Sequence, residues 1–224
     1  MRLRRKAPVD DDLHDDIDTE GADGGADPGA PSTGDALRAG GPWDAGELQV
    51  SPDDPDRIDL GSLSVKGRED VEVRLQVDEA SQQVTGLMLV AKDGALELRP
   101  FAAARHEDLW ATVRPQISSE AARRGGTATE VDSPYGRALE LRVPAVDEQG
   151  RSGTQISQVM GVAGPRWLLR VTVFGRPAQE WRDDGALEQA LRDVVVDRGS
   201  EAMPPGESLP LRLPSGAQRV DGPE

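Results

Sequence analysis

The sequence predicts an α+β domain with a mostly antiparallel sheet and two helices packed on one face of that sheet. Apolar and polar residues alternate in several short segments, which is the period of a half-buried strand. Short turns rich in Gly, Pro, Asp and Ser join these segments, so consecutive strands are expected to run antiparallel. Two other segments carry apolar residues at every third or fourth position, as amphipathic helices do.

Composition separates the first 40 residues from the rest of the chain. Between Ala7 and Leu37 there is no Lys or Arg, and there are ten acidic residues among many Gly, Ala, Pro and Ser. Such a segment cannot bury enough apolar surface to offset the entropy of ordering it. We therefore expect a disordered acidic tail over residues 1–40, a single α+β domain over 41–214 and a disordered end over 215–224.

Four strands are expected before the first helix, at residues 58–65, 71–78, 84–92 and 96–103. The second of these has the clearest alternation, with apolar residues at every other position. Lys92-Asp-Gly94 is a hairpin turn of the Asp-Gly type and links the third strand to the fourth.

The first helix is predicted over residues 107–124, because Leu109, Val113 and Ile117 draw an apolar stripe. Pro115 conflicts with this pattern, since an interior proline costs about 3 kcal/mol. Either the helix kinks there, or one short turn ends and a second begins. Gly125 and Gly126 are expected to stop it.

The second half of the domain repeats the order of strands followed by a helix. The expected strands are residues 127–131, 138–143, 156–162 and 166–174, and the expected helix is 186–195. Asp184 is placed to cap that helix. Residues 203–214 are too rich in proline for regular structure, but Leu209, Leu211 and Leu213 alternate, as in an extended segment lying over the core.

Several chemistries lack the residues that they need. The chain has no cysteine, which excludes disulfides, thiolate chemistry and cysteine-bound zinc. His106 is the one histidine of the expected domain; we interpret it as a surface residue at a helix start, because no Gly-x-Ser-x-Gly motif accompanies it. No glycine-rich phosphate loop lies between a strand and a helix. We therefore expect no catalytic residue and no cofactor.

A metal site is not expected either. The densest acidic group after the tail is Asp53, Asp54, Asp56 and Asp59. Ile58 and Val65 occupy the positions where a calcium loop needs ligands, so this group is interpreted as a solvated turn.

The net charge of −15 bears on partners and location. Binding along a phosphate backbone needs clustered Lys and Arg, so nucleic acid is not expected as a partner. No run reaches the 18 or so apolar residues of a membrane helix, and anionic membrane surfaces repel an acidic protein. The basic start, residues 1–6, is not followed by an apolar stretch as in a signal peptide. The expected location is the cytoplasm.

One group of residues, a set of arginines on the expected strands, suggests a ligand-binding site. If the apolar sides of the strands face the helices, the other side carries alternating Glu and Arg. The candidate ligand-binding residues on it are Arg99, Arg142, Arg166 and Arg170. Arginine holds carboxylates and phosphates through two parallel hydrogen bonds. The alternative is that Glu and Arg simply pair across strands; Arg166 and Arg170 have the fewest acids nearby.

Several motifs resemble those of a known family. They are Gly41-Pro-Trp-Asp44, residues 96–110 (LELRPFAAARHEDLW), Gly125-Gly126, residues 161–170 (GVAGPRWLLR) and residues 209–214 (LPLRLP). The chain resembles an actinobacterial protein family of unknown function, DUF3710. The use of 23 Arg against 3 Lys fits an origin in a high-GC genome. The resemblance implies an intracellular protein with an acidic, variable N-terminus and no established activity, so it transfers no catalytic residue.

Two functions remain open from the sequence. The first is a non-enzymatic binding or regulatory module with a protein partner, in which the tail, with Thr19, Ser32 and Thr33, is phosphorylated or docks on a basic surface. The second is a small-molecule binding protein or enzyme, which uses the arginine-lined sheet face for a nucleotide or another anion. An enzyme is the less favoured class.

Overall fold

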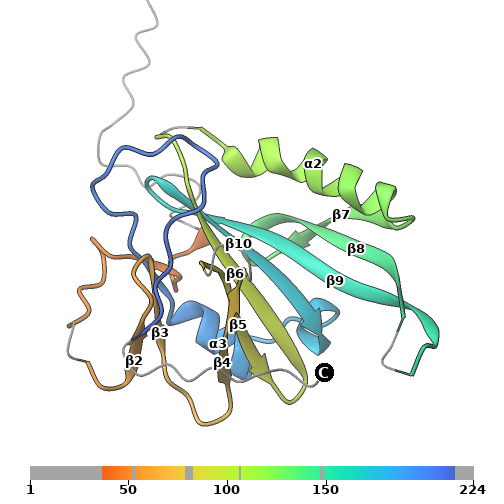
Figure 1. Ribbon diagram of the computed structural model, residues 1–224, viewed down its shortest axis with the longest axis horizontal. Helices are drawn as coiled ribbons and strands as arrows, with labels where there is room; N and C mark the ends of the chain where they lie inside the picture. Colours follow the sequence, from red (N-terminus) through yellow and green to blue (C-terminus); the bar gives the residue numbers. More distant parts are fainter. Residues whose placement is uncertain (1–36, 52–53, 79–82, 106, 147–148, 215–224) are drawn as a thin grey trace, which may run out of the picture. The chain divides into compact units, whose positions relative to one another are not determined.

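The computed structural model describes residues 37–51, 54–78, 83–105, 107–146 and 149–214 (Figure 1). Its main sheet has seven antiparallel strands. In spatial order they are β4 (Glu72–Val77), β5 (Val84–Ala91), β6 (Gly94–Ala102), β10 (Trp167–Gly175), β9 (Ser152–Ala163), β8 (Gly136–Val146) and β7 (Thr127–Ser133). The predicted α+β class, with a mostly antiparallel sheet in a single domain, is confirmed.

A second sheet was not predicted. Its four short strands are, in spatial order, β1 (Trp43–Asp44), β11 (Val195–Val196), β3 (Leu63–Lys66) and β2 (Arg57–Asp59). The single strand expected over 58–65 is wrong, because a turn separates β2 from β3. Gly61 in that turn has a φ of 84°, and its N–H donates to the carboxylate of Asp59. A left-handed φ interrupts a strand and suits glycine.

Two helices complete the regular structure, α2 (Leu109–Arg123) and α3 (Ala186–Arg192), with a short 3₁₀ turn, η1 (Arg176–Ala178), after β10. The prediction that both helices pack on one face of the sheet is wrong. In β10, Leu169 belongs to the large core that includes the α3 residues, whereas its neighbour Leu168 packs in a small core with α2. Successive residues of a strand point to opposite faces. The two helices therefore lie on opposite faces, α2 along β7 and β8, and α3 along β5 and β6 (Figure 1).

The error has a clear source in the strand register. The prediction took the apolar sides of all strands to share one face, and this would include Leu141 in the strand expected over residues 138–143. It pairs with Ser157 in β9, next to Val159, which belongs to the small core under α2. The sheet thus has apolar residues on both faces, and each face needs its own cover.

Helix α2 runs through Pro115 as one continuous helix. Asp108 caps its start, since the carboxylate accepts a hydrogen bond of 2.9 Å from the N–H of Ala111. Pro115 and Ala111 both lie on the exposed side, where water can bond the carbonyl that the proline leaves without a donor. The helix stops at Gly125, whose φ is 74°, as predicted.

Trp110 fixes α2 to the sheet. Its indole N–H donates to the carbonyl of Arg137 at 2.6 Å, and its ring lies directly over Gly161 of β9. A Cβ at Gly161 would lie 2.4 Å from the indole ring, so only glycine permits this close approach.

Helix α3 is shorter than predicted. It ends at Arg192, and Val195 and Val196 join the second sheet as β11, which suits β-branched residues that are buried. The expected cap by Asp184 is wrong. Gly185 is the N-cap, and the buried carboxylate of Glu188 folds back and accepts from the N–H of Arg182 at 3.1 Å.

The C-terminal segment is extended, as predicted for residues 203–214. Leu209 is buried, and Leu211 makes isolated bridges to Gly61 and to Val84. The predicted acidic tail up to residue 36, His106, Asp53 and the end at 215–224 lie outside the described residues. None of the described helices is both long enough and apolar enough to span a bilayer.

Candidate functional site

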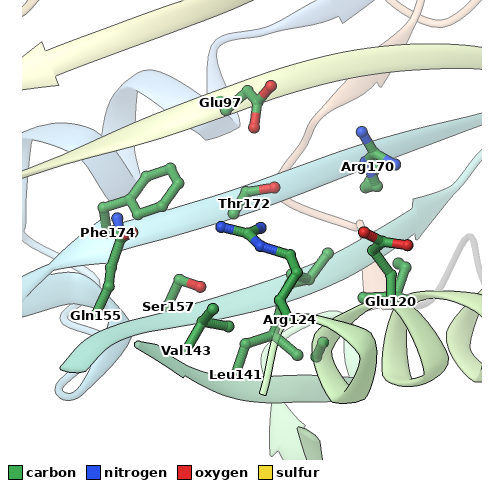
Figure 2. A pocket seen from close by; sticks show the side chains of 13 residues that line it. Glu97, Glu120, Arg124, Leu141, Val143, Gln155, Ser157, Arg170, Thr172 and Phe174 are labelled. Carbon is green, nitrogen blue, oxygen red and sulfur yellow. The ribbon is translucent and has the colours of Figure 1, made fainter. Parts of the chain in front are cut away.

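A hollow of about 340 Å³ lies between the C-terminal half of α2 and the sheet (Figure 2). Strands β6, β8, β9 and β10 supply its other walls. Its apolar lining residues are Ile117, Ala121, Leu141, Val143, Val159 and Phe174. Its polar lining residues are Glu97, Glu120, Arg124, Gln155, Ser157, Arg170 and Thr172. The volume is at the lower end of the range of small-molecule sites.

The strand register explains which side chains face the hollow. Arg170 of β10 pairs with Gly161 of β9, and Thr172 pairs with Val159, so these four residues share one face. Ser157 is two residues further along β9 and lies on the same face. Beneath α2, this face therefore changes along β9 from Val159 to the smaller Ser157, which leaves space between helix and sheet.

Arg170 is the central charged group of the site. Its guanidinium lies 5.3 Å from the ring centre of Phe101 and is half-buried. A guanidinium that stacks on a ring through its face keeps its N–H edge free for other partners. Burial lowers the pKa of Arg170 and the charge of Arg99 lowers it further, while the charge of Glu97 opposes both effects in part. Arginine stays protonated in proteins, so this position holds a costly positive charge.

Arg99 stands directly opposite Arg170 in the pairing of β6 with β10. Like charges in such a cross-strand pair repel each other. The guanidinium of Arg99 lies 2.6 Å from the carboxylate of Glu97 and also donates to Gln76 at 3.1 Å. Glu97 thus pairs with Arg99, which leaves the charge of Arg170 without a salt-bridge partner in the described part of the chain.

The second free guanidinium belongs to Arg124, the residue that ends α2. Figure 2 shows its side chain extending over the hollow from the end of the helix. Glu120, the nearby carboxylate of α2, lies 2.6 Å from Arg123 instead. Across the ranges that the structure describes, neither Arg124 nor Arg170 has a carboxylate within 4.0 Å, because Glu97 and Glu120, which also line the hollow, pair with Arg99 and Arg123.

The four arginines predicted to share a face do not all meet. Arg99 and Arg170 are neighbours, as expected. Arg142 lies on the opposite face, since it pairs with Ile156 and not with a residue of the Ser157 side, so its predicted place beside them is wrong. Its exposed guanidinium bonds to Glu140 at 2.8 Å. The sequence left open that Glu and Arg pair across strands; the pair that Arg142 forms lies within one strand instead.

Arg166 lies in a second hollow, of about 750 Å³, at the other end of α2. Trp110, Gly161 and Leu168 contribute to its walls. This hollow is bounded by Leu37, Ala104, Arg105 and Glu107, next to parts of the chain that the structure does not describe. Arg166 and Arg170 therefore do not form one site.

Sequence reasoning missed Arg124, Ser157 and Thr172. Ser157 carried a signal, because it is a polar residue on the apolar side of a strand, in line with Val159. Arg124 carried a weaker one as the last residue before the Gly125-Gly126 stop. Neither could be placed beside Arg170 before the order of the strands was known.

Comparisons with known proteins identify the family of this chain but assign it no activity. Among the described residues, no three of His, Asp and Glu gather as a metal site would require. A search of curated proteins finds no match to this chain. A family model described as a protein of unknown function, DUF3710, matches residues 41–220. The chain therefore belongs to the DUF3710 family.

Proposed function

We propose that this domain is a non-enzymatic binding module whose ligand is an anion, held beneath α2 by Arg170 and Arg124. The observation that carries the proposal is the half-buried guanidinium of Arg170, which faces a hollow without a salt-bridge partner in the described part of the chain.

The energetics of charge burial support an anion. A buried charge is costly unless it is paired and hydrogen-bonded. Burying the charge of Arg170 costs more, because the like charge of Arg99 stands opposite and Glu97 forms its salt bridge with Arg99. A carboxylate or phosphate in the hollow would supply the missing partner. It would also receive parallel hydrogen bonds from the free edge of the guanidinium.

The same contacts favour binding over catalysis. The two carboxylates in the hollow, Glu97 and Glu120, are each bonded to an arginine at 2.6 Å. Both carboxylates are therefore already engaged in ion pairs with arginines of the protein. The protein partner expected from the sequence stays a prediction.

Thermal unfolding of the 224-residue chain tests the proposal. The anions are sodium phosphate and sodium benzoate, each compared with sodium chloride at equal ionic strength. A ligand present at 100 times its Kd adds about 2.7 kcal/mol to the free energy of unfolding. For a domain of this size, that raises the Tm by roughly 5–10 °C.

Two arginine variants locate the effect. Arg170→Met keeps most of the side-chain volume but removes the charge, and we expect it to abolish the rise in Tm. Arg142→Met removes an exposed arginine from the opposite face and should respond like the wild type. Equal rises in all three proteins, or no rise with either anion, would refute the proposed site.

A further inference from the structure

We infer that the ligand of this hollow is an amphipathic organic acid, with its charged head at Arg170 and Arg124 and its hydrocarbon body on the apolar floor. The inference rests on the proposed function and adds the chemical class of the ligand.

The inference rests on the apolar residues of the sheet that line the hollow. The lining residues Leu141, Val143, Val159 and Phe174 come from three adjacent strands and form an apolar surface beside the arginines. Val143 and Val159 are already buried, whereas Leu141 and Phe174 are half-buried, and an inorganic anion would leave their exposed parts in water. An organic acid would remove these parts from water, which is the dominant favourable contribution in most binding sites.

Helix α2 gives a second argument. The first half of its apolar stripe is used in packing, since Leu109 and Trp110 are buried in the small core with Leu168. The second half, with Ile117 and Ala121, faces the hollow. Ala121 is buried, and Ile117 packs against the small core but stays half-buried. A hydrocarbon body would cover the part of Ile117 that the small core leaves exposed.

The size of the hollow limits the ligand. A volume of about 340 Å³ equals that of about eleven water molecules at roughly 30 Å³ each. A carboxylate with a body of six to ten carbon atoms is of this size.

A chain-length series tests the inference. Binding of acetate, butyrate, hexanoate, octanoate and decanoate to the 224-residue chain is measured by titration calorimetry, below the critical micelle concentrations. Each methylene that the hollow buries should raise the affinity by about fourfold, until the hollow is full. A flat series, with acetate bound as tightly as octanoate, would overturn the amphipathic class and leave the anion site standing.

The same series on Arg170→Met separates the head from the body. We expect all affinities to fall by a similar factor, about 10- to 100-fold, with the dependence on chain length retained. Unchanged affinities in Arg170→Met would instead overturn the proposed anion site. The two failures are therefore distinguishable.

A third variant keeps the charge and fills the space. Ser157→Leu places an apolar side chain in the hollow, and we expect it to weaken octanoate binding more than acetate binding. Its Tm without ligand shows whether the fold is intact. If the fold is disturbed, Thr172→Leu on the neighbouring strand serves the same purpose. Full octanoate affinity in a folded, filled variant would place the hydrocarbon body elsewhere and overturn the inference.

Discussion

The two faces of the seven-stranded sheet are built from alternate residues of the same strands, yet they are covered differently. On one face, α3 and the second sheet close over β5, β6 and β10. The large core there contains 24 buried residues of the described chain. On the other face α2 closes over a small core of four, and the hollow lies beyond it.

The difference shows how a domain divides stability and binding between two surfaces of one sheet. The face with the large core is covered by apolar residues of α3 and of the second sheet, which leaves little room for a ligand. The face with α2 is held at one end by Trp110 and stays open near Arg170. Binding sites are expected where packing is incomplete and polar groups converge.

The largest effect should come from truncating an α3 residue in the large core. Leu191 is fully buried, so Leu191→Ala should lower the free energy of unfolding by about 2–5 kcal/mol. Ile117→Ala on the open face removes a half-exposed side chain and should cost about 1 kcal/mol or less. Urea unfolding of both variants gives the comparison. Equal losses would contradict the difference in packing between the faces.

A smaller effect should follow from enlarging Gly161, the contact that holds α2. In Gly161→Val the new side chain meets the ring of Trp110, and we expect a loss of about 1–3 kcal/mol in chemical unfolding. Gly153→Val is the matched control in the same strand, because a Cβ there has nothing within 4 Å.

A double-mutant cycle sharpens this prediction. Trp110→Ala removes the ring, so Gly161→Val should cost much less in that background. Additive losses would mean that the clash with Trp110 is not the cause.

The smallest effect concerns Tyr135, which is buried in the large core and meets Trp181 edge to face at 6.2 Å between ring centres. Burial raises the pKa of its hydroxyl to about 12. The folded state thus holds this proton more tightly than the unfolded state, whose pKa is about 10. Its contribution to stability is complete below pH 10 and is lost as the pH rises from 10 to 12, with no effect at neutral pH.

Ultraviolet absorbance of the phenolate measures this directly, because the chain has a single tyrosine. The midpoint should be near 12 in the folded protein, or coincide with alkaline unfolding, and near 10 in guanidinium chloride. A midpoint of 10 in the folded protein would show that the ring is not buried.

Much of the fold was accessible from local patterns. The alternation in residues 167–173 gave both sides of β10 correctly, and the stripe of Leu109, Val113 and Ile117 gave α2. The errors came where tertiary contacts compete with local preference. Val195 fits the helical period and was expected to end the helix, but pairing with β3 places it in a strand. Gly185 displaced Asp184 as the cap, because the carboxylate of Glu188 folds over it.

The candidate site was predictable only in part. Arg170 could be selected because few acids lie near it in the sequence, and it does line a hollow. Arg142 was placed beside it in error, because the alternation within a strand does not tell which face its odd or even residues join. That depends on the register with each neighbouring strand.

By itself, the sequence determined the class of the fold and most of the strands and helices. These follow from local periodicity and composition, which act within a few residues. The tertiary structure alone decided that the helices lie on opposite faces, that Arg124 and Arg170 line one hollow and that Arg142 lies on the other face. Strand order and register set these contacts, because they join residues far apart in the chain.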